Sequence, residues 1–188
     1  MSKHTSPIHL LAIDPGSRYL GVAVFEDLFL LNWRTQIIED KGRSAQAAVS
    51  RVRQIVRQSI KEHHVTMVVV RPYCPCPRHT SKVVAAMVKE IQRFGKQQGL
   101  RVCLYDPQRA RKFLCQGTRA TKMEVARIIS TDRYPHPLLR HIYEETRAKP
   151  WFREKYHLQM FSAIALGLYA LSKCQHIRLS SEPHNDVY

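Results

Sequence analysis

Apolar and polar positions along the first third of the chain predict three consecutive strands. Residues 8–14 form an apolar run of strand length that ends at Asp14. Residues 19–25 and 28–34 have the same character, and the acidic pair at 26–27 predicts a tight hairpin turn between them. Three strands with such short connections predict an antiparallel meander.

From residue 44 onward, helical and strand patterns alternate. The stretch 44–61 carries a single apolar stripe and predicts a helix with Ser44 as its N-cap, and the β-branched run 65–70 predicts a buried strand. Residues 131–152 are mixed and broken by prolines, so no helix is predicted there. The other predicted elements are helix 80–97, strand 101–105, helix 107–114 capped by Asp106, helix 121–130 with a Thr121–Glu124 capping box, and helix 155–173.

This order of elements predicts an α/β fold. Three meander strands followed by alternating helices and strands imply a mixed five-stranded sheet with helices on its faces. We expect the last two strands to be parallel to the first. The length of 188 residues fits one domain, which we place at 1–175, followed by a polar tail at 176–188.

The net charge of the chain indicates which class of partner it binds. The chain carries 30 Lys and Arg against 15 Asp and Glu, a formal net charge of +15. A folded domain this basic usually faces a polyanion, with nucleic acid as the leading candidate and an anionic membrane surface as its rival. No apolar run is long enough to span a bilayer, and the start of the chain does not resemble a signal peptide.

Cysteine usage favours a reducing compartment. The five cysteines are an odd set without a disulfide spacing, so we expect reduced thiols and a cytoplasmic location, with association to the nucleoid an open option. Cys74, Cys76 and His79 lie together, but a zinc site needs a fourth ligand and normally a wider cysteine spacing. We therefore interpret them as loop residues.

Specific motifs resemble one family. The stretch Leu11–Ser17 (LAIDPGS), followed by Gly21-Val22-Ala23, resembles the opening of the RuvC-type Holliday junction resolvases of the RNase H-like superfamily. Later segments resemble the family's fourth strand, fifth strand and last helix in the same order, so the resemblance spans about 8–173. It implies an RNase H-like fold, a nucleic-acid substrate, and a strand-terminal Asp14 as the first metal ligand.

The resemblance also exposes departures from the family's acidic set. The position of the fourth-strand Glu falls on Arg71, the closing Asp falls on Ser162, and an Asp or His one helical turn earlier falls on Gln159. Asp14 alone is retained. Nucleases of this kind hold two divalent ions on three or four carboxylates, whereas a guanidinium repels metal.

We interpret Arg71 as a replacement for a metal ion's charge. It would pair with Asp14 or with a phosphate, and Asp14 would form an ion pair or cap its turn. Other interpretations stay open: Asp14 as an ordinary turn residue, Arg71 as an exposed strand-end residue, and Gln159 and Ser162 as satisfied polar groups. A displaced acid or base could also rebuild a site from three candidates, which are Glu26, Glu154 and His157.

Basic residues at the same rim of the sheet are the predicted phosphate contacts, although a solvated basic face is the ordinary alternative for each. These residues are Arg71, Arg78, Lys82, Arg109, Arg111, Lys112, Arg119, Lys122 and Arg127. Nearby aromatic residues could stack on unpaired bases, although core packing is their commoner fate. The aromatic residues are Tyr73, Tyr105, Phe113 and Trp151.

Three functional hypotheses follow. The first is a nucleic-acid-binding protein without nuclease activity and without a cofactor, which binds branched or structured DNA or RNA, alone or in a larger nucleoprotein assembly. The second is an active junction endonuclease with a rearranged site that requires Mg²⁺ or Mn²⁺. The third is a scaffold for an acidic protein partner. The resemblance also implies a homodimer, for which the apolar face of helix 80–97 is a candidate, although burial in the core explains that face equally well.

Overall fold

The structure is a computed structural model that describes residues 6–38, 45–72, 82–116, 120–148 and 154–180. Its centre is one five-stranded sheet in the order β3-β2-β1-β4-β5. The strands are β1 (His9–Pro15), β2 (Tyr19–Glu26), β3 (Phe29–Ile37), β4 (Met67–Val70) and β5 (Arg101–Leu104). The first three form the predicted antiparallel meander, and β4 and β5 are parallel to β1 as expected.

Strand register places the ends of β1 and β4 side by side. Ile13 is the partner of Val70, so Asp14 and Arg71 follow as neighbours at the carboxyl ends of two parallel strands. Glu26 instead pairs with His9, at the opposite end of β1. The hypothesis that Glu26 could rebuild a site with Asp14 is therefore wrong, because almost the full length of β1 separates them.

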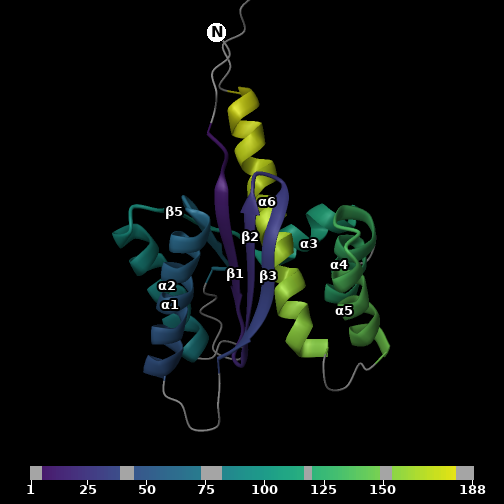
Figure 1. Cartoon of the computed structure of the whole chain (residues 1–188), viewed down its shortest axis with the longest axis horizontal. Helices are drawn as coiled ribbons and strands as arrows, with labels where there is room; N and C mark the ends of the chain where they lie inside the picture. Colours follow the sequence, from purple (N-terminus) through teal and green to yellow (C-terminus); the bar gives the residue numbers. More distant parts are fainter. Residues whose placement is uncertain (1–5, 39–44, 73–81, 117–119, 149–153, 181–188) are drawn as a thin grey trace, which may run out of the picture.

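Two helices cover one face of the sheet (Figure 1). These are α1 (Ala45–His63) and α2 (Lys82–Gln97), whose apolar residues pack on the β-branched side chains of β1, β2 and β4. The α2 stripe, from Val84 to Phe94, is buried in this core. The suggestion that this stripe forms a dimer contact is therefore wrong, since the core already uses it.

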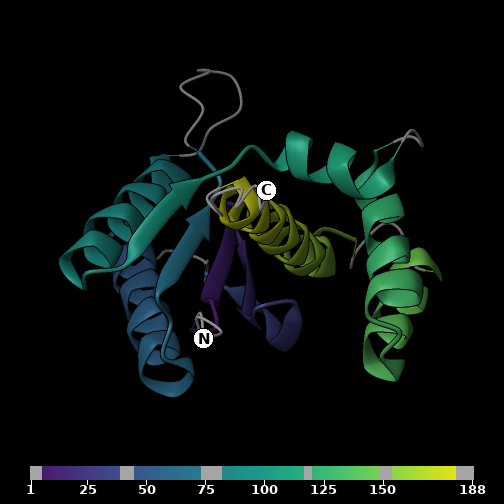
Figure 2. The same ribbon diagram turned by 90° about the horizontal axis from the view of Figure 1, so that it is seen from above.

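The other face is covered by α6 (Glu154–Ser180), and Figure 2 shows this helix between the sheet and an outer arc of helices. The arc comprises α3 (Pro107–Cys115), α4 (Lys122–Ile128), the π-helix η1 (Ile129–Arg133) and α5 (Pro137–Ala148). Gly21 allows α6 to lie directly on β2, because a Cβ at this position would overlap the backbone carbonyl of Gln159. This close approach sets the height of α6 above the end of β1.

The structure departs from the predicted elements in the second half of the chain. Helix α5 was not predicted, because Pro135 and Pro137 were interpreted as breaks, whereas Pro137 is the first residue of α5. The last helix continues to Ser180 instead of ending at 173, and β3 extends three residues further than predicted. No helix within the described ranges is long and apolar enough to cross a membrane.

Candidate nucleic-acid interface

Asp14 lies near the end of β1 and is almost completely buried, with 2% of its side chain exposed. The alternation of β1 turns it toward α6, on the same face as Leu10 and Ala12, which belong to the core beneath that helix. The chain then turns tightly, with the Gly16 amide donating to the Tyr19 carbonyl at 2.8 Å. A carboxylate in this position is enclosed by its own turn, by β2 and by α6.

Arg71 forms an ion pair with Asp14, which is one of the two pairings expected for it. Its Nη1 lies 3.6 Å from the Asp14 Oδ1, a separation that fits an ion pair and is too long for a hydrogen bond. The Arg71 side chain is 30% exposed, so the guanidinium bridges a buried acid and solvent. It can hold Asp14 on its inner side while it presents other N–H donors outward.

Two further cations act on Asp14. Burial raises the pKa of the Asp14 carboxyl above its ordinary value, and the positive charges of Arg71, Lys122 and Arg111 oppose this rise. Lys122 begins α4 and Arg111 lies within α3, so two different helices of the outer arc bring their charges to the end of β1. We call Arg71, Arg111 and Lys122 the cationic triad.

Helix α6 lies over Asp14, and the side chains that it places there are neutral and polar. Gln159 packs against both Gly16 and Gly21, and Ser162 follows one turn later with almost no exposure. The Gln159 Oε1 and the Asp14 Oδ1 are both buried acceptors without a hydrogen-bond donor among the described residues. Two unsatisfied oxygens of this kind cost stability unless a proton, a water or a ligand reaches them.

The buried carboxylate makes the stability of the protein depend on pH. Because the folded protein binds the Asp14 proton more tightly than the unfolded chain does, the free energy of unfolding falls as the pH rises from about 3.8 toward the raised pKa. Asp14→Asn should therefore be more stable than the natural chain at pH 7, with the difference shrinking near pH 4. Urea unfolding at both pH values measures this.

Glu144→Gln provides the matched control, because Glu144 is an exposed acid in a surface ion pair with Arg140. It should leave the free energy of unfolding nearly unchanged at both pH values. A loss of stability in Asp14→Asn at pH 7 would mean that the ion pair with Arg71 outweighs the cost of burying the Asp14 charge.

The remaining predicted contacts fall into three groups. Arg109 and Lys112 are exposed on α3, next to Arg111 in the chain, and Lys82 is exposed at the start of α2. Arg127 is instead neutralised within its own helical region, with ion pairs to Glu124 at 2.8 Å and to Asp132 at 3.8 Å. Arg78 and Arg119 lie outside the described residues.

The other candidate groups either form ring contacts or lie outside the described residues. Tyr105 and Phe113 both pack edge-on against Tyr169, although Phe113 remains 37% exposed. His157 packs against Tyr156. Tyr73, Trp151, the Glu154 side chain and the proposed zinc ligands Cys74, Cys76 and His79 fall outside the part that the structure describes. Within that part, no cluster of His, Cys, Asp or Glu could hold a metal ion.

The described residues around Asp14 do not fit a pair of divalent cations. Hard cations require several charged oxygen ligands, and Asp14 is the one carboxylate that this site offers among the described residues. A permanent cation, Arg71, already pairs with it. Gln159 and Ser162 contribute neutral groups where the resemblance places an Asp or His and an Asp.

Comparison with solved structures supports the fold. Thermus thermophilus RuvC matches over 93% of this chain and 98% of its own, with 17% identity and a TM-score of 0.63. The chain therefore has the fold of a RuvC-type resolvase. T. thermophilus RuvC in complex with a Holliday junction substrate gives a TM-score of 0.61 at 17% identity, covering 93% of this chain and 97% of that one.

The yeast mitochondrial Holliday junction resolvase Ydc2 has the same RuvC-type fold, with a TM-score of 0.60, 10% identity and coverage of 92% of this chain and 82% of its own. No protein-family model matches the sequence, and no curated protein matches it. Similarity at such low identity establishes the RuvC-type fold alone.

Proposed function

We propose that this RuvC-type protein binds branched or structured nucleic acid through the cationic triad and leaves it uncut. The ion pair between Arg71 and Asp14 carries this proposal. Arg71 can donate two parallel N–H groups to a phosphate while its charge offsets that of Asp14. Binding of this kind requires no cofactor.

The surrounding charges favour a phosphodiester strand as the ligand. Arg111 and Lys122 add two cations from separate helices, and Arg109 and Lys112 extend the basic surface along α3. Phosphate contacts position a nucleic acid without reading its sequence, so recognition would depend on the shape of the strand. Since T. thermophilus RuvC, which shares this fold, has been solved in complex with a Holliday junction substrate, a four-way junction is the first ligand to test.

One observation favours a second candidate, a junction endonuclease with a rearranged site that uses Mg²⁺ or Mn²⁺. The Asp14 Oδ1 and the Gln159 Oε1 are unsatisfied buried acceptors among the described residues, and a cation would satisfy both. Against it stands the Arg71 guanidinium, whose charge opposes the entry of a metal ion.

A cleavage and binding assay separates the two. Purified protein is incubated with labelled four-way junction, duplex and single strand, of DNA and of RNA, in the presence of Mg²⁺ or Mn²⁺. We expect binding without cleavage, and an affinity that falls by about tenfold or more between roughly 50 and 200 mM salt, because bound phosphates release counterions. Denaturing gels and mobility shifts measure the two outcomes.

Asp14→Asn is the control for cleavage. Metal-dependent products that disappear in Asp14→Asn would refute the proposal and support the second candidate. If neither DNA nor RNA bound, the basic charge would instead serve an acidic protein partner.

A further inference from the structure

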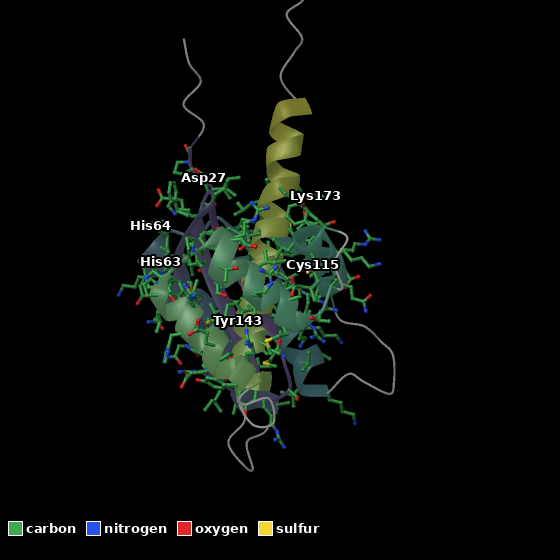
Figure 3. The ribbon with its side chains drawn as sticks, turned by 90° about the vertical axis from the view of Figure 1, so that its right-hand side faces the viewer. Asp27, His63, His64, Cys115, Tyr143 and Lys173 are labelled. Atoms are coloured by element: carbon green, nitrogen blue, oxygen red, sulfur yellow. The ribbon has the colours of Figure 1, made fainter. Side chains whose placement is uncertain are left out.

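The β2–β3 hairpin turn and the start of α5 form a surface at the opposite end of the sheet from Asp14. The Tyr134 hydroxyl donates to the Leu28 carbonyl at 2.7 Å, and the ring of His136 meets the edge of Trp33 at a centroid distance of 5.2 Å. Figure 3 places Asp27, in the turn, and Lys173, on α6, toward this same end of the molecule. We call this region the hairpin surface.

A π-helix shapes the hairpin surface. The helix η1 ends with the Tyr134 amide donating to the Ile129 carbonyl at 2.9 Å, the five-residue spacing of a π-helix. Turns of this kind often occur at functional sites. The chain then leaves η1 through Pro135, and Pro137 begins α5. This path holds Arg133 and Tyr134 against the hairpin.

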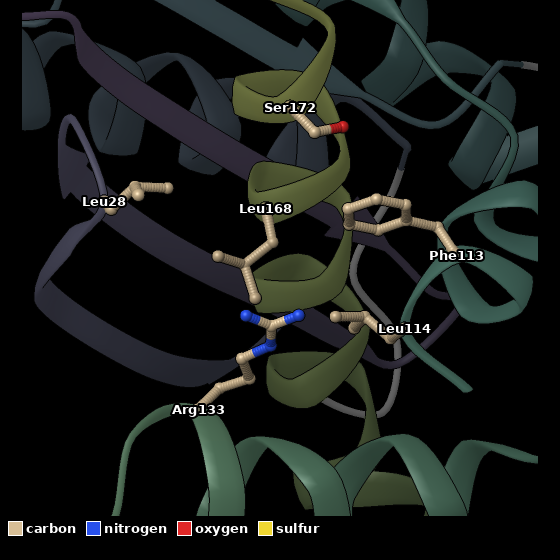
Figure 4. Close-up of a pocket in the computed structure, with 6 residues that line it drawn as sticks. All are labelled: Leu28, Phe113, Leu114, Arg133, Leu168 and Ser172. Carbon is tan, nitrogen blue, oxygen red and sulfur yellow. The ribbon is translucent and has the colours of Figure 1, made fainter. Parts of the chain in front are cut away.

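Two apolar hollows open on the hairpin surface. The first has a volume of about 150 Å³ and lies between Leu28 of the turn, Leu168 of α6 and Phe113 of α3 (Figure 4). The second, of about 250 Å³, is lined by Trp33, Tyr134 and Leu139 among others. An apolar cavity of about 150 Å³ holds a benzene-sized group, so each hollow can take an apolar side chain.

Exposed apolar side chains line the first hollow, and another follows Pro137, a lining residue of the second, in the chain. Leu28 is 49% exposed and Leu138 is 50% exposed, and Phe113, in the wall of the first hollow, is also open to solvent. Single exposed apolar residues are ordinary, but a cluster around two hollows is typical of an interaction site.

A positive charge in the first hollow indicates which kind of ligand would bind there. Figure 4 shows the Arg133 guanidinium pointing into it, between Leu168 and Leu114. Within the described residues, Arg133 has no hydrogen bond or ion pair with a carboxylate, and no carboxylate of those residues lines the hollow. A ligand that combines an apolar group with a negative charge would therefore complement it.

We propose that the hairpin surface binds an acidic, apolar peptide segment of a partner protein. Apolar side chains of the segment fill the two hollows, and one of its carboxylates pairs with Arg133. The chain's net charge of +15 attracts such a segment and repels a second copy of itself. The apolar lining disfavours nucleic acid, whose phosphates the cationic triad serves at the other end of β1.

Fluorescence anisotropy with a labelled probe tests this. The probe is a peptide of about 12 residues in which Leu and Phe alternate with Asp and Glu, and its partner peptide has Ser in place of each apolar residue. We expect the apolar probe to bind, and Arg133→Glu to weaken that binding by about tenfold or more. The Leu28→Ser/Leu138→Ser variant should weaken it too.

Arg51→Glu is the matched control, since Arg51 is exposed on α1 across the sheet and gives the same change of charge. This variant should change the affinity for the apolar probe by less than about twofold.

Four results would overturn the inference: no binding of the apolar probe, equal binding of the Ser peptide, an equal loss in Arg51→Glu, or a loss of junction affinity in Arg133→Glu with the probe unaffected. A dimer that Leu28→Ser/Leu138→Ser disperses, seen by light scattering, would assign the surface to a second copy instead. The first three results and the dimer test do not depend on whether the triad binds nucleic acid.

Discussion

Neutralising the cationic triad should weaken binding to a four-way junction by about 100-fold at moderate salt. The variant is Arg71→Gln/Arg111→Gln/Lys122→Gln. Each lost phosphate contact also removes about 0.9 from the slope of log affinity against log salt, so the slope should fall by roughly 2.7. Fluorescence anisotropy over a series of salt concentrations measures both quantities.

The control removes the same charge from the other side of the sheet. Arg51→Gln/Lys61→Gln/Lys89→Gln acts on exposed residues of α1 and α2, far from Asp14. It should leave affinity within about threefold of the natural chain, since exposed charges beyond a Debye length are screened. Equal losses in the two variants would contradict a localised site and would mean that the net charge alone attracts nucleic acid.

Local patterns were sufficient to predict most of the fold. Alternation and β-branched runs located all five strands, and Asp106 caps α3 by accepting from the Gln108 amide at 2.9 Å. Local patterns failed where a proline can either interrupt a helix or begin one. Pro137 was interpreted as a break, but it starts α5, and His136 caps this helix by accepting from the Leu138 amide at 3.2 Å.

The site was only partly predictable, because its residues converge through long-range contacts. The resemblance indicated that Asp14 and Arg71 meet, and the register of β1 against β4 confirms it. No local signal could separate Arg111, whose charge acts on Asp14, from Arg127, which two carboxylates already engage. That distinction depends on where each helix of the outer arc lies against α6.

The burial of Asp14 also had no signal in the sequence. A strand-terminal acid before Pro-Gly indicates a position at the rim of the sheet but not how exposed it is, and the turn at Gly16 and the closely packed α6 enclose Asp14. Burial without a full set of partners costs stability, and such costs persist in proteins mainly at functional sites. The arrangement is consistent with a site whose ligand, and not its fold, accounts for the buried acid.

Restoring carboxylates should restore metal dependence if the RuvC-type scaffold still places the acidic positions around Asp14. Arg71→Glu/Ser162→Asp removes the guanidinium and adds two acids, one at the end of β4 and one on α6, beneath which Asp14 lies. Three carboxylates in one buried site repel each other without a counter-ion and attract Mg²⁺. We expect the double variant to cleave a four-way junction in Mg²⁺, which denaturing gels detect.

Thermal unfolding gives a second readout that does not depend on cleavage. Mg²⁺ at about tenfold above its dissociation constant should raise the unfolding midpoint of the double variant by about 3–6 °C and leave the natural chain unchanged. Ser162→Asp alone should gain neither property, because Arg71 would pair with the new acid, and Asp14→Asn in the double variant should abolish both. If Mg²⁺ stabilised the natural chain as much as the double variant, Arg71 would not be what keeps the metal out, and the site would have to be described as a metal centre built around Asp14 and Gln159.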